Sequence, residues 1–454
     1  MLQLKAYLNS YTHAATLAFF RLAFGLMMFF GIVRFMSYGW IDKFYIQPVF
    51  HFTYYGFSWV KPYGLFTYSA FILCGISALM VAVGYKYRTA IILFFITFTY
   101  TELLDKTTYL NHYYFVSVIS FVMIFLPANA YFSADAYKNP AKAFTQIPRW
   151  TTDILKLLLA IVYIYAGLAK LNSDWLFNAM PLKIWLPGNA HLPVIGPMLT
   201  KEWVAYTFSY AGAVYDLGIV FLLLYKRTRW LGFTLVVIFH ILTKILFPIG
   251  IFPYVMIVAS LLFFSAGFHI KVLGYIAQFL KIPFNPSAES RTKAVPNTAL
   301  YNFKIVFLAA FILLQLAFPF RYLLYPQELF WAEEGFRFSW RVMLMEKAGY
   351  AEFKVSDPVT GKGLTVDNSK FLTPFQEKQM SFQPDFILEY AHFLHDHYQA
   401  QGMHDPEVRV SSYVALNGRL STLYIDPNVN LAKQDESFLH KTWILPFKDT
   451  IKGL

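Results

Sequence analysis

The chain has 454 residues, of which 57% are hydrophobic, 20% are aromatic and only 14% are charged. Soluble domains carry about 25% charged residues, so this composition excludes an ordinary soluble protein and a disordered chain. The net charge is +12, but the basic residues stand singly or in short groups between apolar blocks. This arrangement is typical of membrane topology signals and not of a nucleic-acid-binding surface. The single cysteine excludes an intramolecular disulfide and a cysteine-ligated metal cluster.

Nine apolar segments are candidates to cross a bilayer, whose hydrocarbon core requires about 20 residues of helix. They lie at roughly 14–36, 64–85, 89–104, 112–128, 152–171, 202–225, 228–248, 251–266 and 301–323. The third, fourth and eighth segments are short for a span. We therefore expect a polytopic α-helical membrane domain over residues 1–325.

The distribution of lysine and arginine predicts the orientation of these spans. With a cytoplasmic N-terminus, the cytoplasmic segments carry 14 basic residues, against 5 in the external loops before the last span. The asymmetry favours nine spans and places the tail outside the cytoplasm. An error of one span would reverse that placement.

The tail, residues 326–454, has no apolar run long enough to span a membrane. A turn-rich connection between the strand-like segments 351–356 and 364–366 predicts a β-hairpin. Apolar residues with a helical period predict one amphipathic helix over 384–400. Segments 406–413 and 419–425 are further expected strands, so we expect a small α+β extracytoplasmic domain.

Ionisable side chains within apolar spans are costly and mark either a function or a buried pair. The candidates are Arg21, Asp105, Lys106, His112, Lys170, Asp216, His240 and Lys244. The expected topology places four of them in the outer half of the membrane, facing the tail. These four are His112, Lys170, His240 and Lys244.

Each candidate also has a purely structural interpretation. Lys170 ends a span and can extend to the aqueous interface. Asp216 and Arg21 can form a structural pair, with each other or with the backbone, and His240 can be a hydrogen-bonded histidine of the bundle. The tail histidines are better explained by a solvated helix face than by a zinc site; they are His392, His395 and His397. The residues alone predict an outer polar pocket and name no reaction.

Residues 104–112, Leu-Asp-Lys-Thr-Thr-Tyr-Leu-Asn-His, resemble a motif of the vitamin K-dependent γ-glutamyl carboxylase family. Further segments that resemble the family follow in order, at 166–175, 215–217, 239–240, 247–256, 338–340, 425–429 and 442–446. The resemblance covers nearly the whole chain. Its compact length is similar to that of bacterial-type members, also described as horizontally transferred transmembrane domain proteins.

The resemblance implies a membrane enzyme, a carbon dioxide-fixing lyase. In this family, reduced vitamin K (a naphthohydroquinone) is deprotonated and reacts with dioxygen, and the resulting strong base removes the γ-proton of a peptide glutamate. The carbanion adds carbon dioxide to give γ-carboxyglutamate, and the quinol leaves as the epoxide. The implied partners are the lipid bilayer, the vitamin K quinol and a glutamate-containing peptide or protein, with no metal, no biotin and no nucleic acid. The implied location is the bacterial inner membrane, with the tail periplasmic.

The resemblance also implies roles for single residues. Lys170 aligns with the base that deprotonates the hydroquinone, a role that burial of a lysine in apolar surroundings makes physically reasonable. Asn111 and His112 align with residues of the carboxylation step, where they stabilise an oxyanion or position carbon dioxide. The residues assigned to the cofactor are His240, Thr243, Lys244 and Asp105.

Two departures from the family pattern leave other functions open. Lys244 places an extra positive charge near the expected pocket, and the tail is shorter than in the vertebrate enzyme, so recognition of a propeptide is in question. One alternative is a quinol epoxidase, or another quinone-linked oxidoreductase, that lacks carboxylation. Another is a non-enzymatic membrane receptor, scaffold or transporter.

Overall fold

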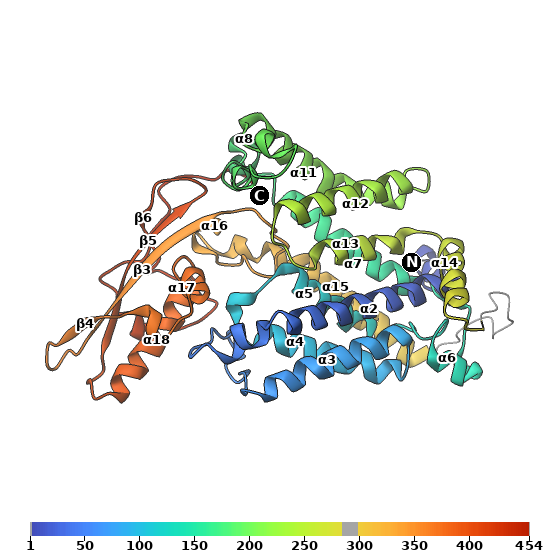
Figure 1. Ribbon diagram of the computed structural model, residues 1–454, viewed down its shortest axis with the longest axis horizontal. Helices are drawn as coiled ribbons and strands as arrows, with labels where there is room; N and C mark the ends of the chain where they lie inside the picture. Colours follow the sequence, from blue (N-terminus) through green and yellow to red (C-terminus); the bar gives the residue numbers. More distant parts are fainter. Residues whose placement is uncertain (1, 284–297, 454) are drawn as a thin grey trace.

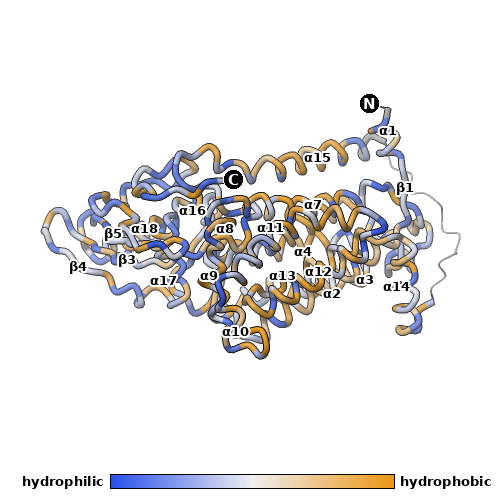
Figure 2. The backbone as a smooth tube through the Cα atoms, turned by 90° about the horizontal axis from the view of Figure 1, so that it is seen from above, coloured by the Kyte–Doolittle hydropathy of each residue, from blue (hydrophilic) through white to orange (hydrophobic). Residues whose placement is uncertain are grey.

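The apolar segments form a bundle of long helices, and the tail forms a separate domain at one end of it (Figure 1). The computed structural model describes residues 2–283 and 298–453. In Figure 2 the bundle helices are mostly hydrophobic, whereas the tail mixes hydrophilic and hydrophobic segments. The hydrophobic residues of the chain are therefore concentrated in the bundle.

Each expected span corresponds to a helix. The long helices are α2 (Ala15–Ser37), α3 (Phe66–Val83), α4 (Tyr87–Leu103), α5 (Asn111–Met123), α7 (Trp150–Leu168), α11 (Glu202–Leu224), α12 (Arg229–Leu246), α13 (Phe252–Ser260), α14 (Ala266–Phe279) and α15 (Thr298–Ala317). Shorter helices connect them: α1 (Leu2–Leu8), α6 (Ala134–Lys138), α8 (Ser173–Asn178), α9 (Leu182–Trp185), α10 (Gly196–Leu199) and the 3-10 turn η2 (Lys106–Thr108).

Among the described residues, six helices are long and apolar enough to cross a membrane. A seventh span is possible if α13 and α14 are taken together, but the chain bends by 120° between them. Helices α4 and α5 have only 17 and 13 residues. The three segments that the sequence marks as short are therefore the ones on which the span count depends, and nine spans stays a prediction.

Close helix packing holds the bundle together. At the contact between α2 and α3, a Cβ added to Gly25 would lie 2.5 Å from the backbone nitrogen of Ala82. Only glycine permits this approach, which is the way helices associate where lipid offers no hydrophobic driving force. A Cβ added to Gly75 of α3 would have its nearest neighbouring atom at 3.6 Å, so the same interface is less crowded there.

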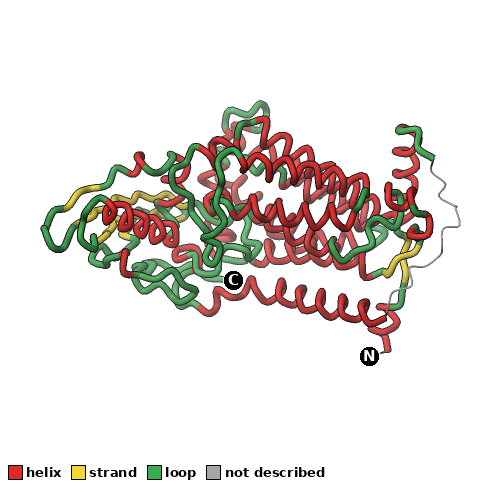
Figure 3. The backbone as a smooth tube through the Cα atoms, turned by 90° about the horizontal axis from the view of Figure 1, so that it is seen from below, coloured by secondary structure: helices red, strands yellow, loops and turns green. Residues whose placement is uncertain are grey.

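The tail contains an antiparallel sheet in the order β4-β3-β5-β6. Its elements are α16 (Leu329–Ala332), β3 (Lys347–Ser356), β4 (Gly363–Thr365), α17 (Pro374–Met380), α18 (Pro384–Ala400), β5 (Glu407–Leu416) and β6 (Thr422–Leu423). The predicted hairpin and amphipathic helix are confirmed. β3 begins earlier than predicted because β5 pairs with all ten of its residues. Figure 3 shows a second, two-stranded pair at the opposite end of the molecule, formed by β1 (Tyr11–His13) and β2 (Gln146–Pro148).

A buried ion network attaches the tail to the bundle. Lys106 of η2 is 3% exposed and lies 2.9 Å from Asp385 and 3.3 Å from Glu389 of α18. Arg337 also contacts Asp385, at 2.6 Å. Burial raises the pKa of the Asp385 carboxyl, but Arg337 and Lys106 outweigh this effect and hold it well below its ordinary value. These contacts fix the tail over one end of the bundle.

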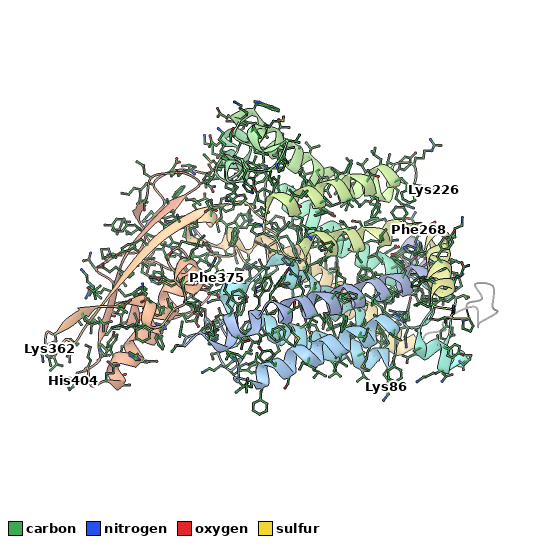
Figure 4. All side chains as sticks on the ribbon, in the orientation of Figure 1. Lys86, Lys226, Phe268, Lys362, Phe375 and His404 are labelled. Atoms are coloured by element: carbon green, nitrogen blue, oxygen red, sulfur yellow. The ribbon has the colours of Figure 1, made fainter. Side chains whose placement is uncertain are left out.

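Figure 4 shows where labelled charges lie relative to this arrangement. Lys86 and Lys226, which follow α3 and α11, lie at the end of the bundle away from the tail. Lys362 and His404 lie at the far tip of the tail. The basic connections that predict the orientation are thus on the side opposite the tail domain.

Candidate functional site

A cavity of about 730 Å³ lies between α7, α11, α12 and α13, near the tail. Most of its walls are apolar or aromatic and include Val162, Phe208, Phe239, Phe247, Phe252 and Met256. Val342 and Met343, from the segment that leads into β3, complete the lining. Such walls suit a flat apolar ring and offer few polar groups that could orient one.

Lys170 is the basic group of this cavity. It follows the end of α7 and is only 6% exposed. Its Nζ donates to Asp216 Oδ2 at 2.7 Å and to the Ala166 carbonyl at 3.2 Å, and it lies 5.2 Å from the centre of the Trp175 ring. The lysine therefore turns into the protein, and the interpretation that it extends to the interface is wrong.

Asp216 lies within α11 and is 5% exposed. Its partner is Lys170, so of the two expected alternatives the pairing of Asp216 with Arg21 does not occur, whereas the pairing of Arg21 with the backbone does. Arg21 instead donates to the backbone carbonyl of Phe132 at 2.5 Å. A buried carboxylate and ammonium form a pair with no net charge, and this is the arrangement in which such groups persist in apolar surroundings.

His240 supplies the second polar group of the cavity. Its Nε2 lies 3.0 Å from the hydroxyl of Tyr163, which is itself 3.4 Å from the hydroxyl of Tyr215. Its Nδ1 is buried and has no hydrogen-bond partner among the described residues. A buried polar atom without a partner is costly, so this nitrogen is available to a ligand hydroxyl. Thr243 also lines the cavity, and its hydroxyl donates to the His240 carbonyl.

Comparison with known protein families shows the family to which this chain belongs. Residues 9–268 match the family model of the HTTM domain, and residues 300–450 match that of the vitamin K-dependent gamma-carboxylase, lumenal domain. The chain belongs to the vitamin K-dependent γ-carboxylase family. No solved structure matches it. Among the residues that the structure describes, no group of His, Cys, Asp or Glu side chains is placed to hold a metal ion.

Asn111 and His112, which the resemblance connects with the carboxylation step, do not line the cavity. The His112 ring lies 5.6 Å from the ring of Phe252, whose other neighbour is His240 at 5.4 Å. Phe252 therefore separates His112 from the cavity. The side-chain nitrogen of Asn111 donates to the Arg341 carbonyl at 3.0 Å, which ties the start of α5 to the segment that leads into the tail.

Two residues assigned to the cofactor also lie elsewhere. Lys244 is exposed and hydrogen-bonds to the Tyr254 hydroxyl, outside the cavity lining. Asp105 precedes η2, where it accepts hydrogen bonds from Thr107 and from Gln376 of the tail. Burial raises the pKa of the Asp105 carboxyl to about 7, although these hydrogen bonds partly oppose the shift. The observed contacts of Asp105 join the bundle to the tail.

Sequence reasoning did not select Tyr163, although a signal for it exists. Tyr163, Ala166 and Lys170 follow one another at helical spacings of three and four residues, so they share one face of α7 and its extension. Arg34 and Glu102, which are ionisable residues of expected spans, were also not among the candidates selected from the sequence. They line a second cavity of about 460 Å³.

Proposed function

We propose that this protein is an integral-membrane carboxylase that couples oxygenation of reduced vitamin K to the epoxide with γ-carboxylation of a peptide glutamate. The observation that carries the proposal is the buried Lys170–Asp216 pair, 2.7 Å apart, in an apolar cavity of a chain from this family. Six apolar helices and the match to a lumenal domain support a membrane protein with an extracytoplasmic tail. We place it in a bacterial inner membrane with a cytoplasmic N-terminus.

The residues that line the cavity are of the kind that would hold the reduced cofactor. Its aromatic walls suit a naphthalene ring, and the unpartnered Nδ1 of His240 suits a ring hydroxyl. Lys170 and His240 would hold the polar groups of the ring, with Thr243 beside them. When bound with dioxygen and carbon dioxide, reduced vitamin K supplies the strong base that removes the glutamate γ-proton and leaves as the epoxide.

Lys170 is the group that accepts the quinol proton. To do so, its amine must first be neutral, so the pair first releases one proton to solvent, which leaves a neutral amine beside the Asp216 carboxylate. After proton transfer, the carboxylate stabilises the ammonium that forms. Asp216 is therefore the positioning residue of Lys170.

Exclusion of water is the second contribution of the chain. A strong base inside the membrane would be quenched by bulk protons, and the apolar lining limits their access. Val342 and Met343 complete the lining where the tail begins. The peptide substrate therefore reaches the cavity from the tail side.

The proposal is tested with purified protein supplied with reduced vitamin K, a glutamyl peptide and labelled bicarbonate. We expect labelled peptide and quinone epoxide, and we expect Lys170→Ala to abolish both products. Lys201→Ala changes an exposed lysine just before α11 and serves as the matched control. Label incorporation that persists in Lys170→Ala would refute the assignment of the base.

One observation favours a second candidate, quinol epoxidation without carboxylation. Lys170 and His240 line the cavity, whereas Asn111 and His112, which the resemblance connects with carboxylation, do not. Epoxide formed without label incorporation across a broad panel of glutamyl peptides would support this candidate. Formation of neither product would instead favour a non-enzymatic receptor or transporter.

A further inference from the structure

Strand β3 is paired along its whole length on one side and only at its distal end on the other. β5 pairs with residues 347–356, whereas β4 pairs with residues 354–356, and the Phe353 carbonyl accepts from the N–H of Val366 just beyond β4. On the β4 side, the Ala351 carbonyl accepts a hydrogen bond from the side chain of Asn368 at 3.1 Å. In Figure 1, β4 lies at the tip of the tail, and the other end of β3 runs toward the bundle. The half of β3 nearer the membrane domain therefore has an open edge.

The open edge presents backbone hydrogen-bonding groups. In an antiparallel sheet, alternate residues of a strand direct their N–H and C=O groups to opposite edges. Because Ala351 directs its carbonyl to the β4 side, Lys347 and Gly349 direct theirs there too. Within the described part of the chain, no backbone group bonds to the outward N–H and C=O of Lys347 and Gly349. Such an edge is a template for another extended segment.

A groove of about 880 Å³ runs beside this edge. One wall is residues 346–351, and the other is formed by α17 and the two residues after it. A Cβ added to Gly349 would lie 2.3 Å from the Ser381 carbonyl oxygen, so glycine lets this wall approach the strand. The exposed side chain of Lys378 on α17 also lines the groove.

The groove begins close along the chain to the cavity that contains Lys170. Val342 and Met343 line the cavity, and the groove begins at Glu346, so about 10 Å of extended chain separates the two. Trp185, which also lines the cavity, donates to Glu346 Oε2 at 2.7 Å. One short stretch of chain therefore borders both spaces.

We propose that the peptide substrate binds in this groove as an added strand on the open edge of β3, alongside α17. Its backbone pairs with Lys347, Gly349 and the N–H of Ala351, and the residue at the cavity end of the groove delivers its glutamate side chain toward Lys170. Backbone pairing recognises an extended conformation and tolerates many side chains, as in other cases of β-strand addition. This inference rests on the proposed function because it names how that site receives its peptide.

Hydrogen exchange resolved to single amides tests the pairing directly. The full-length protein in detergent is measured without reduced vitamin K, with and without a synthetic peptide that has one glutamate among uncharged residues. We expect exchange at Lys347, Gly349 and Ala351 to slow about tenfold with peptide, since each gains a hydrogen bond. The β5-facing amides of Ala348 and Tyr350 should not change. Unchanged exchange at the three outward amides, at a peptide concentration that saturates carboxylation, would overturn the proposal.

Substrate backbone changes give an independent test. N-methylation of the peptide at single positions should raise KM about tenfold at every second residue and leave the residues between them unaffected. Equal effects at adjacent positions would contradict strand addition. Lys378→Trp, which fills the groove, should raise peptide KM, whereas Lys370→Trp, at an exposed site outside the groove lining, should not. Peptide-dependent protection without any carboxylation would support the groove and refute the proposed function, so the two failures are distinguishable.

Discussion

Replacement of Asp216 by asparagine removes the negative charge of the side chain and keeps its shape. The side chain keeps its size and an oxygen that can accept from Lys170 Nζ, now 2.7 Å from the carboxylate. What is lost is the negative charge that stabilises the ammonium formed when Lys170 accepts the quinol proton. Hydrogen bonds to charged groups are worth about 1.5–3 kcal/mol. A loss of about 2 kcal/mol in the transition state lowers kcat about thirtyfold.

The assay for Asp216→Asn is the rate of epoxide formation as a function of quinol concentration and pH. We expect kcat to fall about thirtyfold and the quinol KM to change less than about threefold, because the cavity walls are unaltered. The acid limb of the kcat/KM profile should move to lower pH, since the protonated amine has lost its counterion. A purely structural role would reduce the amount of folded protein and leave that profile in place.

Asp153→Asn is the matched control. Asp153 lies on α7, where it pairs with Arg149 and Lys156 at the end of the helix away from the cavity. We expect kcat and the pH profile of this variant to match those of the unaltered protein. An Asp216→Asn protein with kcat within twofold of normal and an unshifted profile would refute the reasoning.

Three further predictions concern the ligand, the interface and the bundle. His240→Phe removes the unpartnered Nδ1 and should raise quinol KM about tenfold in the epoxidation assay, and an unchanged KM would contradict its role in binding. Asp385 has a depressed pKa, so its contribution to stability is complete above pH about 4 and is lost as the pH falls further. Thermal unfolding measured from pH 6 to 3 should therefore show a decrease in Tm that is smaller in Asp385→Asn. The same dependence of Tm on pH in both proteins would contradict this role of Asp385. Gly25→Ala, whose Cβ would lie 2.5 Å from a backbone atom, should destabilise the protein by about 1–3 kcal/mol, whereas Gly75→Ala should be nearly neutral. Equal Tm values for these two variants would show that α2 and α3 can move apart at Gly25 without a cost in stability.

The candidate site could be predicted in part because membrane burial makes polar residues conspicuous. Lys170, Asp216 and His240 stand out of apolar spans, and all three line the observed cavity. Their partners could not be predicted, since Lys170 and Asp216 are 46 residues apart and only the packing of α7 on α11 joins them. The position of His112 behind Phe252 likewise depends on how α5 and α13 meet.

The sequence by itself determined the helices that match the nine expected spans, the hairpin turn and the helix α18. These features depend on local information: the length of an apolar run, the period of apolar residues and turn-forming residues at short range. Only the tertiary structure decided the 120° bend between α13 and α14, the pairing of β3 with β5 and the open edge that it leaves. The reason is physical, because strand partners and helix contacts are selected by the mutual packing of distant surfaces, whose energies no short segment contains.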